Sequence, residues 1–154
     1  MCLLQSKGLD YAYRVSQTEG SSFTRGFPEA LHLYITMHDI KPTFLYEHCN
    51  PHSLEGLLGG KWDAYAYYNN FFIARNALFT SPAVTHFLSY LDRVGGIYTQ
   101  RWGDALIHAA TVQMYVPKER VHGFTDWEYK HSWMLVPKGK RAHWNSKIYL
   151  EDVT

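Results

Sequence analysis

The chain has 154 residues, and its 15 Lys and Arg against 14 Asp and Glu give a formal net charge of +1. This length suits a single domain with a real core. The even charge balance argues against a dedicated nucleic-acid-binding protein. Two cysteines, Cys2 and Cys49, cannot build a disulfide framework or a four-cysteine zinc site. No apolar run approaches the roughly 18 residues of a spanning helix, and no signal peptide is visible, so we expect a globular chain without a membrane segment.

Aromatic content is the unusual feature of the composition. Tyr, Phe and Trp together make up 16% of the residues. Aromatic rings fill cores efficiently, and they also stack on sugars and bases. Both core packing and a sugar-binding site are open readings of this composition.

The N-terminal third predicts a strand followed by a helix. Residues 11–16 are rich in aromatic and β-branched side chains, as in a short strand, and residues 17–25 are polar, as in a loop or helix entry. Apolar residues then recur at helical spacing over about 27–40. Pro28 suits the first helical turn and Pro42 closes the segment.

The middle of the chain predicts an irregular connection and then an extended segment. Residues 45–61 contain Asn50-Pro51 and three glycines, which favours irregular structure with at most a helical turn. From 64 to 76, apolar residues alternate at Tyr65, Tyr67, Phe71 and Ile73, which indicates an extended, half-buried segment.

Two further helices are well marked. Ser81 and Pro82 fit the N-cap and first position of a helix over 82–94, and Gly95-Gly96 supplies its left-handed end. A second helix is expected over 104–115, then a short strand over 121–124, with the remaining residues loop-like. Strands that alternate with helices predict α/β layers.

Residues 95–108 carry one specific motif, GGIYTQRWGDALIH. It resembles the segment GGFYYERWGDAPVH of the fungal-type α-1,2-mannosyltransferases, the glycolipid 2-α-mannosyltransferase family. Flanking matches run in order over roughly residues 66–131: Asn70-Phe71 with Ile73-Ala74, Tyr90-Leu91-Asp92, residues 116–122, and Asp126, Tyr129 and His131.

The resemblance implies a GT-A-like α/β fold, of which this chain is the C-terminal portion as a single domain over 1–154. It also implies transfer of mannose from GDP-mannose to the 2-hydroxyl of an α-mannoside, with Mn²⁺ as cofactor. A divalent cation is needed because the diphosphate leaving group concentrates negative charge. The family members are Golgi membrane proteins, and the resemblance alone carries that localisation to this chain.

The resemblance also proposes site residues, each with a structural alternative. Asp104 would position or activate the acceptor hydroxyl, or stabilise the start of its helix. His131 would ligate the metal. Arg101, Trp102, Tyr129 and Asn70 would contact substrate. The alternative for Arg101 is a salt bridge to Asp104, and the alternative for Trp102 and Tyr129 is core packing.

Two departures from the family pattern bear on activity. The family's Glu-Pro-Asp metal segment is missing, and Phe72 stands where the family has a glutamate that is a candidate nucleophile. Phenylalanine has no electron pair to offer an oxocarbenium-like centre. We therefore expect the isolated chain to be inactive. A non-catalytic carbohydrate-binding relative, or a truncated fragment, is the alternative function.

Overall fold

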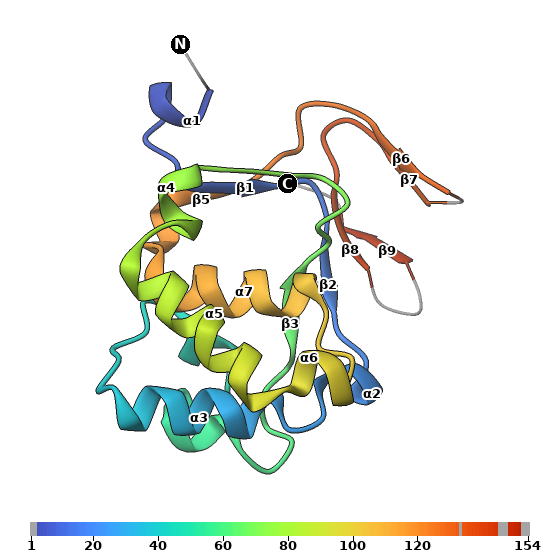
Figure 1. Cartoon of the computed structure of the whole chain (residues 1–154). Helices are drawn as coiled ribbons and strands as arrows, with labels where there is room; N and C mark the ends of the chain where they lie inside the picture. The colour runs from blue at the N-terminus through green and yellow to red at the C-terminus, as the bar shows by residue number, and fades with distance from the viewer. Residues whose placement is uncertain (1–2, 133, 145–147, 152–154) are drawn as a thin grey trace.

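The computed structural model describes residues 3–132, 134–144 and 148–151. Its longer helices lie together in one half of the molecule, and most of its short strands lie above and beside them (Figure 1). The α-helices are α1 (Leu3–Ser6), α2 (Ser21–Thr24), α3 (Phe27–Met37), α4 (Asn76–Phe79), α5 (Pro82–Val94), α6 (Gly96–Thr99) and α7 (Asp104–Tyr115). Single 3-10 turns are η1 (Leu45–His48), η2 (Leu54–Leu57) and η3 (Lys118–Arg120). The mixed α/β architecture expected from the sequence is confirmed.

In the described residues the strands form three small sheets. They are β1 (Tyr11–Tyr13), β2 (Ser16–Thr18), β3 (Tyr65–Tyr67), β4 (Phe72–Ala74), β5 (Val121–Gly123), β6 (Tyr129–His131), β7 (Met134–Val136), β8 (Arg141–Trp144) and β9 (Ile148–Glu151). The first sheet has the order β4-β1-β5, with β5 parallel and β4 antiparallel to β1. The second has the order β3-β2-β8-β9, and β6 and β7 form a separate hairpin.

Two expected extended segments are each broken into two strands. The strand predicted over 11–16 is interrupted at Arg14 and Val15, so that β1 joins one sheet and β2 the other. The segment predicted over 64–76 is interrupted by a turn at Asn69 and Asn70, and its halves β3 and β4 again join different sheets. Residue type located the first segment and the alternating pattern the second, but neither showed where the chain passes between sheets.

The expectation of a loop-like C-terminal region is wrong. Four strands, β6 to β9, lie beyond residue 128. They are short and mixed in composition: β6 and β7 form a local hairpin, β9 pairs with β8, and β8 also lies parallel to β2, more than 120 residues earlier in the chain. Propensity within a short window carries no signal for such long-range pairing.

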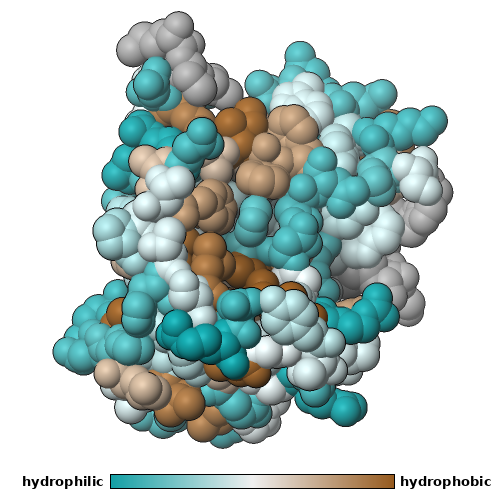
Figure 2. Space-filling view, viewed as in Figure 1, coloured by the Kyte–Doolittle hydropathy of each residue, from teal (hydrophilic) through white to brown (hydrophobic). Residues whose placement is uncertain are grey.

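The three long helices agree with the sequence prediction. Ser81 caps α5 by accepting a hydrogen bond from the Val84 amide, and Gly95 ends that helix with a φ of 78°. α5 packs against α3 and α7, and α7 also packs along β3. Apolar residues gather in the middle of the face shown in Figure 2, framed by hydrophilic ones. Within the described residues, no helix is long and apolar enough to cross a membrane.

Candidate functional site

The stretch before α7 is anchored by a buried tryptophan. Trp102 is 4% exposed, and its indole nitrogen donates to the Arg25 carbonyl at 2.8 Å. Its ring meets Phe27 edge-on at 5.1 Å and lies directly over Gly96, where an added Cβ would sit 2.4 Å from ring atoms. Of the two readings left open for Trp102, these contacts favour core packing. The side chain fixes the point from which α7 starts.

Arg101 lies beside this anchor with a φ of 60°. Its guanidinium carbon lies 5.1 Å from the centre of the Phe23 ring, a cation–π geometry. The ion pairs formed among the described residues do not include one between Arg101 and Asp104. The salt bridge considered for Arg101 is therefore replaced by an aromatic contact.

Asp104 is the first residue of α7, and its carboxylate accepts a hydrogen bond from the Ala105 amide at 3.0 Å. A carboxylate at this end is stabilised by the helix dipole. The negative charge of Asp104 also affects the pKa values of two nearby side chains, Tyr11 and His108. Burial raises the pKa of Tyr11 well above its usual value, and Asp104 adds to that rise. Burial lowers the pKa of His108, and Asp104 opposes that change.

Tyr11 and His108 are residues that sequence reasoning missed. The Tyr11 hydroxyl and His108 Nδ1 are buried and have no hydrogen-bond partner among the described residues. Phe72 covers them: its ring stacks on Tyr11 at 5.7 Å and meets His108 edge-on at 4.9 Å. One available signal was the spacing, since His108 follows Asp104 by four residues and shares its helix face. Buried orphan polar atoms mark a place where a polar group would be accepted.

His131 and Asn70 are brought together by the fold. The Asn70 amide nitrogen lies 3.4 Å from Nδ1 and 3.2 Å from Nε2 of His131. The His131 ring also meets Tyr68 edge-on at 5.5 Å. Tyr129, on the same strand, has its ring 5.8 Å from Trp127. Asn70 can therefore donate to an unprotonated nitrogen of His131.

The residues present do not fit a manganese site by themselves. Within the described part of the chain, no group of three or more His, Cys, Asp and Glu side chains could hold a metal ion. His131 would supply one imidazole, and the amide that approaches its ring nitrogens competes for the lone pair that a metal needs. No chemical step is assigned to a metal in this chain.

Asp104 and His131 belong to different sets of contacts, joined by one short segment. Asn70 reaches His131, whereas Phe72, two residues later, reaches Tyr11 and His108 beside Asp104. That Asp104 and His131 bracket one cleft about 10 Å across, the expected scale of a sugar site, stays a prediction. The shared segment 70–72 is the structural link between the two sets.

The hairpin that carries His131 is tied down by a buried arginine, Arg14, which is 2% exposed. Its guanidinium donates to the Trp127 carbonyl at 3.0 and 3.2 Å, to Pro137 at 3.0 Å and to Lys140 at 3.0 Å. These carbonyls flank β6 and β7 on both sides, so a single side chain closes the base of the hairpin. In the sequence, this role is indicated only by the presence of a charged residue, Arg14, within a strand that is otherwise rich in aromatic residues.

Solved structures with the same arrangement are glycosyltransferases. The mannosyltransferase Ktr4p of Saccharomyces cerevisiae, solved in complex with GDP, aligns with a TM-score of 0.76 at 18% identity over 88% of this chain and 36% of that protein. Core-mannan synthase A of Aspergillus fumigatus, in its Mn/GDP form, aligns with a TM-score of 0.73 over 83% of this chain and 36% of that one. The fold is thus GT-A-like.

Sequence comparison identifies the family. The model of the glycolipid 2-alpha-mannosyltransferase family matches residues 2–148, and the chain belongs to that family. It is 33% identical over 87 residues to O-glycoside alpha-1,2-mannosyltransferase homolog 3 of Schizosaccharomyces pombe, covering 56% of this chain and 23% of the relative. It is 38% identical over 65 residues to glycolipid 2-alpha-mannosyltransferase of S. cerevisiae, covering 42% and 15%. The chain therefore spans less than a quarter of the length of these curated relatives.

Proposed function

We propose that this chain is the C-terminal, acceptor-side portion of an α-1,2-mannosyltransferase that transfers mannose from GDP-mannose to an α-mannoside, with Mn²⁺, in Golgi glycan synthesis. The observation that carries the proposal is the family match over residues 2–148. The GDP and Mn/GDP forms of the two structural neighbours support the donor and the metal.

The surroundings of individual residues support the roles that we propose for them. Asp104 would accept a hydrogen bond from an acceptor hydroxyl, because its carboxylate lies at a helix start beside the unpartnered Tyr11 hydroxyl. Asn70 would fix the ring of His131, the residue that the family resemblance assigns to the metal, although the described residues do not form a metal site by themselves. Arg101 and Tyr129 would contact substrate from the rim, and Trp102 would support the site from the core.

Carbohydrate binding without transfer is the second candidate function, and Phe72 favours it. The Phe72 ring fills the space over Tyr11 and His108 and carries no atom that could attack a sugar. The two candidates share acceptor binding and differ in donor binding. Both predict that the isolated chain transfers no mannose.

Two calorimetric titrations of the purified chain test the proposal. With α-1,2-mannobiose we expect measurable binding, weakened about tenfold in Asp104→Asn by loss of a hydrogen bond to a charged group. Asp92→Asn is the matched control, because Asp92 is an exposed carboxylate that bonds Tyr98 instead. With GDP and Mn²⁺ we expect no binding.

The results of these titrations distinguish the transferase proposal from the carbohydrate-binding one. Absence of mannobiose binding would contradict the acceptor-side assignment. Binding of GDP with Mn²⁺, followed by transfer of labelled mannose, would show that the chain holds a complete donor site. Phe72→Glu alone should not create transfer, because the metal ligands are still incomplete, and detectable transfer by that variant would mean that the site has been placed wrongly.

A further inference from the structure

Two exposed histidines meet where α3 packs against α5, outside the candidate site described above. His38 follows the last turn of α3 as its C-cap residue, and His86 lies in the first half of α5. Their ring centres are 4.7 Å apart, and the ring planes are nearly perpendicular, at 88°. We call these two residues the α3–α5 histidine pair. Among the described residues, neither imidazole takes part in an ion pair.

The separation of the two rings suits a shared metal ion. With metal–nitrogen bonds of about 2.1 Å, two imidazoles at adjacent coordination positions have ring centres about 4.5–5 Å apart. The two rings meet edge to face, so the His38 ring must turn before a nitrogen of each can reach one ion. The His38 side chain is exposed and forms no hydrogen bond with any residue that the structure describes, so no polar contact opposes this rotation.

A buried tyrosine holds His86 in a suitable orientation. Tyr34 is 1% exposed, and its hydroxyl oxygen lies 3.0 Å from Nδ1 of His86. The Tyr34 hydroxyl is itself fixed by the Tyr115 hydroxyl, at 3.3 Å. When Tyr34 accepts a hydrogen bond from Nδ1 of His86, the free lone pair of the imidazole is on Nε2. Metal-binding histidines are commonly oriented in this way, by a hydrogen bond from the ring nitrogen that does not bind the metal.

The surroundings of the pair favour a cation. His38 lies at the C-terminal end of α3, an 11-residue helix whose dipole places partial negative charge there. The adjacent Asp39 pairs with Lys41, so these two exposed charges largely cancel. No group of three or more metal-binding side chains forms in the described part of the chain, so water would complete the coordination. Imidazole nitrogens suit borderline divalent ions such as Zn²⁺ and Ni²⁺ better than Mn²⁺.

We propose that the α3–α5 histidine pair binds one divalent ion of the Zn²⁺ and Ni²⁺ class, through Nε2 of His86 and one ring nitrogen of His38. The ion would link the end of α3 to α5 and so stabilise the packing of these two helices. This site differs from the Mn²⁺ site of the proposed transfer reaction, because both of its protein ligands are imidazoles on the helices. It goes beyond the proposed function, which requires neither histidine.

Calorimetric titration of the chain, without an affinity tag, with Zn²⁺, Ni²⁺ and Mn²⁺ tests the proposal. We expect one Zn²⁺ or Ni²⁺ ion per chain, and an affinity for Mn²⁺ at least about tenfold lower. His38→Gln and His86→Gln should each weaken Zn²⁺ binding at least about tenfold, and Tyr34→Phe should weaken it about tenfold by releasing the His86 ring. His52→Gln is the matched control, because His52 is an exposed histidine whose Nδ1 lies 2.9 Å from the Tyr46 carbonyl instead.

Several results would overturn the proposal. Unchanged Zn²⁺ affinity in either His38→Gln or His86→Gln would show that the two imidazoles do not share an ion, and an equal loss in His52→Gln would show unspecific binding to surface histidines. Zn²⁺ should raise the melting temperature of the unmodified chain but not that of His86→Gln. If a variant fails to fold, equal affinities of the unmodified chain for Zn²⁺ and Mn²⁺ would still exclude an imidazole site. The mannobiose titration involves neither histidine, so the two proposals fail separately.

Discussion

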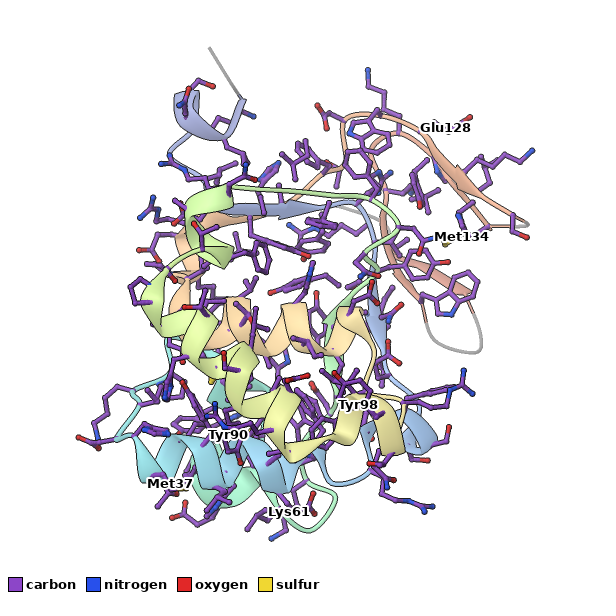
Figure 3. All side chains as sticks on the ribbon, viewed as in Figure 1. Met37, Lys61, Tyr90, Tyr98, Glu128 and Met134 are labelled. Carbon is purple, nitrogen blue, oxygen red and sulfur yellow. The ribbon has the colours of Figure 1, made fainter. Side chains whose placement is uncertain are left out.

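The start of α7 and the β6–β7 hairpin each present a candidate site residue, and they are anchored by opposite physical means. Asp104 follows Trp102, which is held by close packing against Phe27 and Gly96. His131 lies on a hairpin held at its base by Arg14 and main-chain carbonyls. In Figure 3 the labelled Glu128 and Met134 lie at the hairpin, whereas Tyr98, on α6 just before α7, lies away from them among the helices. Trp102 is therefore part of the hydrophobic core, whereas Arg14 holds only the small β6–β7 sheet in place.

The largest effect is expected from removing the apolar anchor. Trp102→Ala should lower the free energy of unfolding by about 3–5 kcal/mol, because it empties a packed site that the backbone at Gly96 cannot refill. Urea denaturation followed by circular dichroism measures the loss. Tyr98→Ala is the control, since Tyr98 is 73% exposed and should cost less than about 0.5 kcal/mol. Equal losses in the two variants would show that Trp102 is not an anchor.

Removing the polar anchor should cost less and act locally. Arg14→Met leaves three carbonyls without their donor, and we expect a loss of about 2–3 kcal/mol. Hydrogen exchange should show β7 amides losing protection while α7 amides keep it, because a hairpin alone is marginally stable. Arg14→Lys should recover part of the protection. A uniform loss over both regions would mean that the hairpin and the helical layer unfold as one unit.

The smallest effect concerns pH at the Asp104 region. The pKa of His108 is lowered in the folded state from 6.5 by burial. The unfolded chain therefore binds a proton first as the pH falls through about 6.5, and the His108 contribution to stability is present above that pH and lost below it. Asp104→Asn removes the charge that supports the imidazolium, so the pKa of His108 should fall further. An NMR titration of the His108 ring measures this, and a rise in the variant would contradict the placement of Asp104.

Much of the fold could be predicted from the sequence because its signals are local. Ser81, Pro82 and Gly95 mark the ends of α5 by capping chemistry that needs no tertiary information. The breaks in the two extended segments could not be predicted, since they depend on which sheet each half joins. β8 was missed for the same reason, since it pairs with the distant β2, whereas β6, β7 and β9 are strands of three or four residues in local pairs, too short to show a clear alternating pattern.

In the candidate site, too, the residues that are contiguous in sequence could be predicted and those brought together by the fold could not. The RWGDA motif located Asp104 and the residues around it, because these residues are contiguous in the chain. Tyr11 lies more than 90 residues earlier, on β1, and comes near Asp104 because its ring packs against His108 on α7. The role of Arg14 was not predicted because it donates hydrogen bonds to main-chain carbonyls. Every residue type has a main-chain carbonyl, so no sequence pattern identifies these acceptors. Contacts that join side chain to backbone over long separations are the ones that sequence patterns conceal.

The β4-β1-β5 sheet has one more consequence, for how the protein behaves at high concentration. In the part of the chain that the structure describes, the outer edges of β4 and β5 pair with no other strand. Open edges are templates for pairing with another polypeptide. Each of these strands is only three residues long, so such a pairing would form few ladder hydrogen bonds. Self-association through this sheet should therefore be weak and reversible on dilution, rather than a route to fibrils.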